Sequence, residues 1–209
     1  MTALRIKHPI LRLEVVGPDG ARRAQLRVFC QRRRRSVLVE DCCECVHRDA
    51  ETSGVTPSVE CTIPSVSLEP RADAAGEKVA VGVVLRTGIV VVSESAPLGR
   101  ASVVLREHGR RSVVIVDNNS VVVGTVHDTG LRRRVGAALV GVVRDVMSRP
   151  IAVHERTPVR VALKLLAASH LREAAVVSDA GVPLGLFRDV DGLRWIAGAR
   201  AARTLDSRR

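Results

Sequence analysis

Four cysteines in the first third of the chain have the residue type and the spacing of a metal site. Cys42 and Cys45 are separated by two residues, the spacing of a turn that presents two thiolates to one ion. Cys30 and Cys61 lie beside expected strands and would complete a tetrahedral zinc site. The alternative is a set of buried, reduced thiols without a metal. A redox pair would need a strand-to-helix setting, which the sequence does not predict.

The elements that must position these cysteines form a small, mainly β module over residues 1–64. Cys43 and His47 are spare donors inside it, so the ligand set stays open. A module of this size has a small hydrophobic core, and a structural zinc ion would supply additional folding free energy. The apolar runs predict strands at 11–16, 24–29 and 36–40.

The remainder of the chain contains one pattern that occurs twice, with a shift of 61 residues and no gap. Each copy has an apolar strand, a helix that follows a proline, two strands joined by polar turn residues, and a second helix. Two copies are too few for a solenoid, so we expect them to pack on each other. Identical residues at this shift include Val92 and Val153, Glu94 and Glu155, Pro97 and Pro158, Arg111 and Arg172, and Gly124 and Gly185.

These patterns predict an α+β fold: a duplicated β-α-β-β-α pair after a small, mainly β N-terminal module. The segment between them is rich in Ser, Pro, Ala, Gly and charged residues, which is typical of a linker. The predicted divisions are the module at 1–64, the linker at 65–78, the pair at 79–200 with repeats at about 79–138 and 139–200, and a tail at 201–209.

The order, spacing and duplication together resemble a tandem pair of CBS (cystathionine-β-synthase) domains. Asp145-Val146-Met147-Ser148 is similar to that family's entry motif, and Val114-Ile115-Val116-Asp117 stands where the family has a Pro-Val-Val-Asp strand. Gly124 and Gly185 stand at the glycine of its second hairpin strand. The resemblance implies that the repeats pack through their sheets, that clefts between them bind adenosyl nucleotides, and that the protein is a homodimer.

The resemblance also implies which residues would bind a ligand. Asp191 holds the position whose carboxylate accepts hydrogen bonds from ribose, and Arg188 replaces the family's hydroxyl residue, where a guanidinium can still bind a phosphate. Gly185 and Val153 complete this candidate set. Gly130 stands at the ribose position of the first repeat and has no acceptor, so at most one adenosyl site is expected. The candidate ligands are AMP, ADP, ATP and S-adenosylmethionine, and the alternative for Asp191 is a carboxylate that stabilises a helix start.

The sequence contains no dinucleotide-binding, P-loop, zinc-protease or nucleophile-elbow motif, so we predict a non-enzymatic protein. The favoured hypothesis is a regulatory module that senses a ligand in the cleft between the repeats. One alternative is a nucleic-acid-associated protein that uses the basic cysteine module. The other is a structural dimerisation pair that has lost its ligand.

The composition limits the partners. The formal net charge is +11, which permits nucleic acid or acidic partners, but an aromatic content of 1% argues against stacking platforms for single-stranded nucleic acid. No apolar run has the length of a membrane span, and charged residues interrupt the start of the chain where a signal peptide would be apolar. We therefore predict a cytoplasmic protein whose cysteines are reduced.

Overall fold

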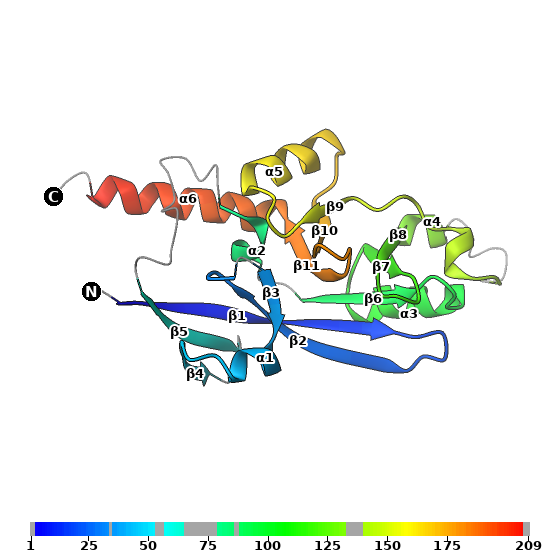
Figure 1. Ribbon diagram of the computed structural model, residues 1–209. Helices are drawn as coiled ribbons and strands as arrows, with labels where there is room; N and C mark the ends of the chain where they lie inside the picture. Colours follow the sequence, from blue (N-terminus) through cyan, green and yellow to red (C-terminus); the bar gives the residue numbers. More distant parts are fainter. Residues whose placement is uncertain are drawn as a thin grey trace.

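The computed structural model describes residues 3–33, 35–52, 57–64, 79–85, 88–132 and 140–206. It confirms the α+β fold class, with the helices of the repeats packed on two β-sheets (Figure 1). The predicted linker at 65–78 lies outside the described residues, as do the last three residues of the predicted tail. Helix α6 extends from the second repeat into this tail as far as Asp206.

The N-terminal part contains long strands and one short helix. The sequence predicts a strand at 36–40, but the strand ends at Leu38 and a helix begins at Val39. Glu40 and Asp41 lie in the first turn of this helix, where the helix dipole favours negative charge. The elements are β1 (Ala3–Val16), β2 (Arg22–Cys30), β3 (Arg35–Leu38), α1 (Val39–Cys43), β4 (Arg48–Thr52) and β5 (Ser58–Pro64).

The two repeats have the predicted order of strand, helix, two strands and helix, and each also begins with a short helix that the sequence did not predict. The first consists of α2 (Val81–Val84), β6 (Ile89–Ser93), α3 (Leu98–Glu107), β7 (Ser112–Val116), β8 (Val122–His127) and α4 (Asp128–Arg132). The second consists of the 3-10 helix η2 (Val143–Asp145), β9 (Ala152–His154), α5 (Val159–Ala168), β10 (Glu173–Val177), β11 (Pro183–Arg188) and α6 (Asp189–Asp206). Helix α3 buries Leu98, Ala101, Val104 and Leu105, a spacing of three to four residues that places them on one face.

Each repeat begins with a short helix that packs on the other repeat. The backbone N–H of Val81 in α2 donates to the carbonyl of Thr157, at 2.8 Å, in the second repeat. The N–H of Val143 in η2 donates to the carbonyl of Ala96, at 2.9 Å, in the first repeat. The two acceptors, Thr157 and Ala96, are related by the 61-residue shift. The two hydrogen bonds between the repeats are therefore equivalent under the internal duplication of the chain.

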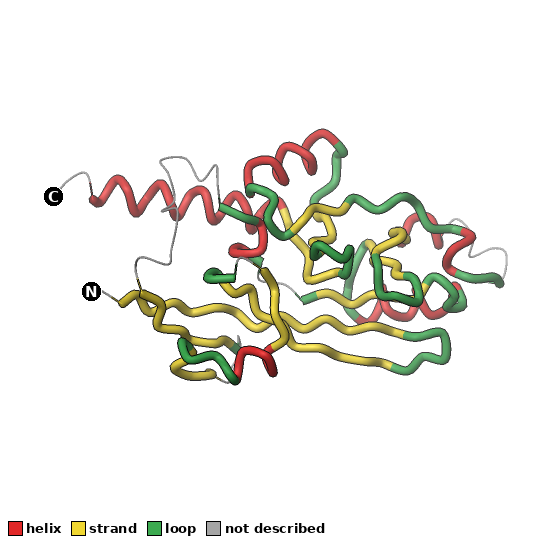
Figure 2. Tube along the Cα trace, viewed as in Figure 1, coloured by secondary structure: helices red, strands yellow, loops and turns green. Residues whose placement is uncertain are grey.

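The strands form an eight-stranded and a three-stranded sheet. The first half of β1 pairs with β5, and its second half pairs with β2 and, in parallel, with β6 of the first repeat. Figure 2 shows the long strands β1 and β2 running along one side of the molecule. The larger sheet has the order β3-β2-β1-β6-β7-β8, with β5 on β1 and β4 on β5, and the smaller has the order β11-β10-β9.

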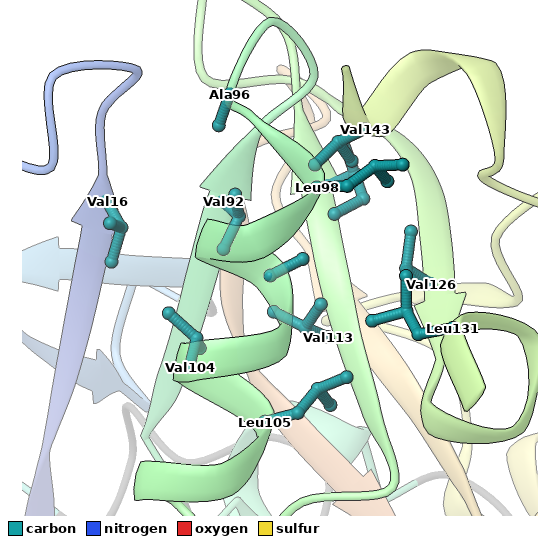
Figure 3. Packing of buried hydrophobic residues seen from close by; sticks show 12 residues of the cluster. Val16, Val92, Ala96, Leu98, Val104, Leu105, Val113, Val126, Leu131 and Val143 are labelled. Carbon is teal, nitrogen blue, oxygen red and sulfur yellow. The ribbon is translucent and has the colours of Figure 1, made fainter. Parts of the chain in front are cut away.

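Strand β1 contributes a buried side chain to each of the four hydrophobic clusters. Ile10 packs among the N-terminal strands, and Leu11 lies in the core of the second repeat. Leu13 lies between the two sheets, and Val16 enters the core of the first repeat beside Val92 (Figure 3). Both faces of the strand are therefore covered, and its second half is an interior strand of the sheet because it pairs with β2 on one side and β6 on the other. The domain division at 1–64 stays a prediction, but these strands share one sheet with the first repeat.

Candidate functional site

A cleft of about 720 Å³ lies between the repeats, where β7 and β8 of the first face β10 and β11 of the second. We call it the inter-repeat cleft. Many of its lining residues fall into pairs related by the 61-residue shift, so the two repeats build equivalent parts of the walls. Such pairs are Arg111 and Arg172, Ser112 and Glu173, Thr125 and Leu186, and His127 and Arg188.

The inter-repeat cleft is strongly cationic. Among the described residues that line it, five are arginines and one, Glu173, carries a carboxylate. The hydroxyl of Ser112 donates to this carboxylate at 2.7 Å. Converging guanidinium groups favour an anionic ligand, above all one with phosphate groups. The arginines are Arg110, Arg111, Arg149, Arg172 and Arg188.

Two of these arginines are neutralised by carboxylates at the start of α6. Arg188 donates from Nε and Nη2 to the two oxygens of Asp191, at 2.8 and 3.1 Å. This hydrogen bond raises the pKa of Arg188 above its ordinary value. Arg172 lies 3.3 Å from Asp189. The bidentate pair joins the end of β11 to the first turn of α6, so it holds the Arg188 guanidinium at the wall of the cleft.

The other three arginines, Arg110, Arg111 and Arg149, make no ion pair with any residue in the described part of the chain. Their charge is therefore available to a ligand. His127 and His170 add two further donors to the lining. His170 has a φ of 55°, in the left-handed region, at the position where the first repeat has Gly109 with a φ of 57°. A side chain there costs conformational energy that a glycine avoids.

The four predicted ligand-binding residues do not lie together on one surface of the structure. Arg188 lines the inter-repeat cleft, whereas Asp191 lies behind it with a side chain that is 9% exposed. Gly185 pairs with Val176 inside the smaller sheet, and Val153 is buried in the core of the second repeat. Only one of the four therefore lies on the cleft surface, and the ligand-binding set stays a prediction.

The sequence reasoning missed most of the arginines that line the inter-repeat cleft. Arg110, Arg149 and Arg172 come from three separate segments and belong to no family motif used above. One signal was available, because Arg111 and Arg172 are identical at the 61-residue shift and both precede a strand. A charged residue kept at one position of both repeats, beside the predicted interface of the sheets, indicates a shared site.

The four predicted metal ligands do come together. Cys30, Cys42, Cys45 and Cys61 line one cavity of about 20 Å³, which we call the thiol cavity. Its other lining residues are Val28, Arg32, His8 and His47. Cys43 points elsewhere, since it is exposed and accepts a hydrogen bond from Arg48. As the side chains stand, no group of three or more His, Cys, Asp or Glu within the described ranges could hold a metal ion.

Two thiols of this cavity, those of Cys61 and Cys42, have raised pKa values. Burial, followed by the neighbouring thiols, raises the pKa of Cys61 to about 11. The same causes, in the same order, raise the pKa of Cys42. Strand β3 leads directly into α1, a strand-to-helix setting that the sequence did not predict; Cys42 is the fourth of the five helical residues and Cys45 lies beyond the helix end. The raised pKa of Cys42 nevertheless opposes a reactive redox pair, which needs a readily formed thiolate.

Comparison with known proteins gives one family. The model of the CBS domain matches residues 81–137 and 143–198, together more than half of the chain. An uncharacterized protein of Methanopyrus kandleri, MK0525, is 31% identical over 121 residues, which are 56% of this chain and 62% of that protein. The chain thus spans less than two thirds of this relative's length. No helix in the described ranges has the length and apolar character to cross a membrane.

Two solved structures share the fold of the repeats. The CBS domain of the bacterial CNNM/CorC family Mg²⁺ transporter in complex with ATP has a TM-score of 0.52 and 22% identity, covering 59% of this chain and 90% of its own. The CBS domain protein PAE2072 from Pyrobaculum aerophilum, complexed with AMP, has a TM-score of 0.51 and 21% identity, covering 57% of this chain and 99% of its own. At these identities the similarity concerns the fold.

Proposed function

We propose that this chain, which belongs to the CBS domain family, is a non-enzymatic regulatory module that binds an adenosyl nucleotide in the inter-repeat cleft. The observation that carries the proposal is the set of arginines on the walls of that cleft. A volume of about 720 Å³ is within the usual range for a small-molecule site. Similar CBS structures are complexes with ATP and with AMP, which supports a nucleotide as the ligand.

The charges favour an anionic nucleotide over S-adenosylmethionine. Arg110, Arg111 and Arg149 have no carboxylate partner in the described structure, so each can bind a phosphate oxygen without first losing an ion pair. A sulfonium ligand would place another positive charge among them, which is unfavourable in a partly desolvated cleft. We therefore expect affinity to rise with the number of phosphates, from AMP to ADP to ATP.

Arg188 and Asp191 have linked roles in this proposal. The bidentate pair fixes the direction of the Arg188 guanidinium and leaves one of its nitrogens for a phosphate. Asp191 then acts as a positioning residue, and it would reach a ribose hydroxyl only by exchanging its partner.

The regulatory step follows from the position of the cleft. A ligand that contacts Arg111 and Arg172 bridges the two repeats, so it stabilises one packing of the two sheets over others. Because β1 pairs with β6 and also enters the core of the second repeat, the N-terminal strands would transmit any change in that packing. The partner that receives this signal is expected to contact the N-terminal strands.

Calorimetric titration of the full chain with AMP, ADP, ATP and S-adenosylmethionine tests the proposal. We expect saturable binding of the nucleotides, with Arg111→Ala and Arg149→Ala each weakening ATP on the order of 10- to 100-fold, as for a lost charged hydrogen bond. Arg106→Ala, an exposed arginine of α3 outside the cleft, is the matched control and should leave the affinity unchanged. No heat with any of the four ligands would refute the nucleotide proposal and favour a purely structural pair.

The proposed assembly is a homodimer in the cytoplasm. Exposed apolar side chains on α5 and α6 of the second repeat support a contact between copies, which light scattering of the purified chain would detect. Nucleic acid is the alternative partner, and binding to duplex or RNA that weakens steeply with added salt would support it instead. The exposed apolar residues are Val161, Leu165, Val190 and Leu193.

A further inference from the structure

The thiol cavity collects four cysteines from four different places in the chain. Cys30 is the last residue of β2, Cys42 lies in α1, Cys45 follows that helix, and Cys61 lies within β5. Cys43, one residue from Cys42, is outside the cavity. The fold therefore selects four of the five cysteines, and separations of up to 31 residues in sequence are closed by the packing of strands.

The strand pairing and the helix end together explain how the cavity forms. Strands β2 and β5 pair with different halves of β1, which brings Cys61 opposite Ile6 and places the end of β2 nearby. The chain then turns at Cys45, whose N–H donates to the carbonyl of Cys42 at 3.1 Å. The N–H of Arg48 donates to the carbonyl of Cys45 at 3.0 Å and closes a second turn. This sequence of turns presents Cys42 and Cys45 to the same side.

The chemistry of the lining selects the class of ligand. A volume of about 20 Å³ has room for one ion or one water, not for an organic molecule. No carboxylate is among the described residues that line it, which disfavours Ca²⁺ and Mg²⁺. Four thiol groups, with His8 and His47 beside them, are the donors preferred by zinc and other soft divalent ions.

We infer that Cys30, Cys42, Cys45 and Cys61 bind one structural zinc-type divalent ion in the thiol cavity. Because no three of the described side chains now surround a common point, ion binding requires the four thiols to move toward one another, and a change of χ1 rotamer is the smallest movement that shifts a thiol. Four thiolates complete a closed tetrahedral site, so the ion has no open position for catalysis.

The ion would order N-terminal segments that contact both repeats, Gly82 of α2 in the first and Glu155 in the second. Phe29 precedes Cys30 and packs so closely on Gly82 that an added Cβ there would lie 2.4 Å from its ring. Further along, the N–H of Ser36 donates to the buried carboxylate of Glu155 at 2.8 Å. Phe29 adjoins Cys30, and Ser36 lies between Cys30 and Cys42, so ordering the thiols also orders the segments that touch the repeat pair.

Metal stoichiometry of the full chain tests this inference. Protein stripped with a chelator and titrated with Zn²⁺ should bind one ion per chain, and Co²⁺ in its place should give the visible absorption of a tetrahedral thiolate site. Cys42→Ser and Cys61→Ser should weaken binding by more than about 100-fold, beyond the loss seen for outer-shell partners. Cys43→Ser is the matched control and should keep the stoichiometry and the cobalt spectrum.

Three outcomes would overturn the inference. One is a wild-type chain that binds no Zn²⁺ and gives no thiolate-to-cobalt absorption. Another is a Cys43→Ser variant that loses as much affinity as Cys61→Ser. The third is a chain whose Cys42 and Cys45 are joined in a disulfide after purification under reducing conditions, as read from its mass. The cobalt spectrum of the wild-type protein decides the matter even if a cysteine variant does not fold.

Discussion

Replacing Val16 by Ala would test whether the N-terminal strands are an integral part of the repeat pair. Val16 is the last residue of β1, pairs with Val92 of β6, and is fully buried in the core of the first repeat (Figure 3). A detachable N-terminal module would tolerate the change without any effect on the repeats. The sheet seen here predicts the opposite, because the lost methyl groups come from the core of the first repeat.

The magnitude follows from the side chain removed. Two buried methyl groups contribute about 0.8 kcal/mol each, or roughly 1.6 kcal/mol in total. The cavity that remains adds a further cost, so we expect a loss of about 2 kcal/mol. With a urea dependence of about 2 kcal/mol per molar, the midpoint of unfolding should fall by about 1 M.

The assay uses the single tryptophan of the chain. Trp195 lies on α6 and packs against the core of the second repeat, so its fluorescence reports the unfolding of the repeat farthest along the chain from Val16. Far-UV circular dichroism reports all strands and helices. If the sheet is one cooperative unit, the Val16→Ala midpoint should shift by the same amount with both probes.

The control is Leu26→Ala on the neighbouring strand β2. Leu26 is 48% exposed, so its truncation should change the free energy of unfolding by no more than about 0.5 kcal/mol. The reasoning is refuted if Val16→Ala leaves the Trp195 transition at the wild-type urea concentration while the dichroism signal of the strands is lost earlier. Such a result would mean that β1 unfolds independently of the repeats.

Two further predictions concern the contacts of the N-terminal strands. Gly82→Ala should lower the free energy of unfolding by about 1–3 kcal/mol, since the added Cβ would clash with the ring of Phe29. Gly99→Ala in α3 meets open space and should stabilise the helix. Urea unfolding of both variants compares them. Arg22 lowers the pKa of Glu107 chiefly through their hydrogen bond, so the pair contributes stability above the ordinary carboxyl pKa and loses it as the pH falls through the lowered value. Glu107→Gln should therefore flatten the acid side of a stability–pH curve, and an unchanged curve would contradict this role.

The sequence alone was sufficient to predict the duplicated fold and the family. Alternating apolar residues, helical spacing and polar turns are local signals, and the 61-residue shift repeats them in register. The duplication predicted that the two repeats pack on each other, and the family resemblance implied that they do so through their sheets. The sequence also predicted that the four cysteines lie together, because two cysteines separated by two residues are typical of a zinc site that further cysteines complete.

Only the tertiary structure decided how the parts are joined and which charges converge. The parallel pairing of Val16 with Val92 links segments 76 residues apart, and no local propensity specifies the partner or register of such a pair. Arg111 and Arg149 line one cleft because the two sheets pack face to face, an arrangement set by the whole core rather than by either segment. Long-range packing thus forms the inter-repeat cleft and the thiol cavity. The types of the residues that line them can be read from the sequence, but their convergence cannot.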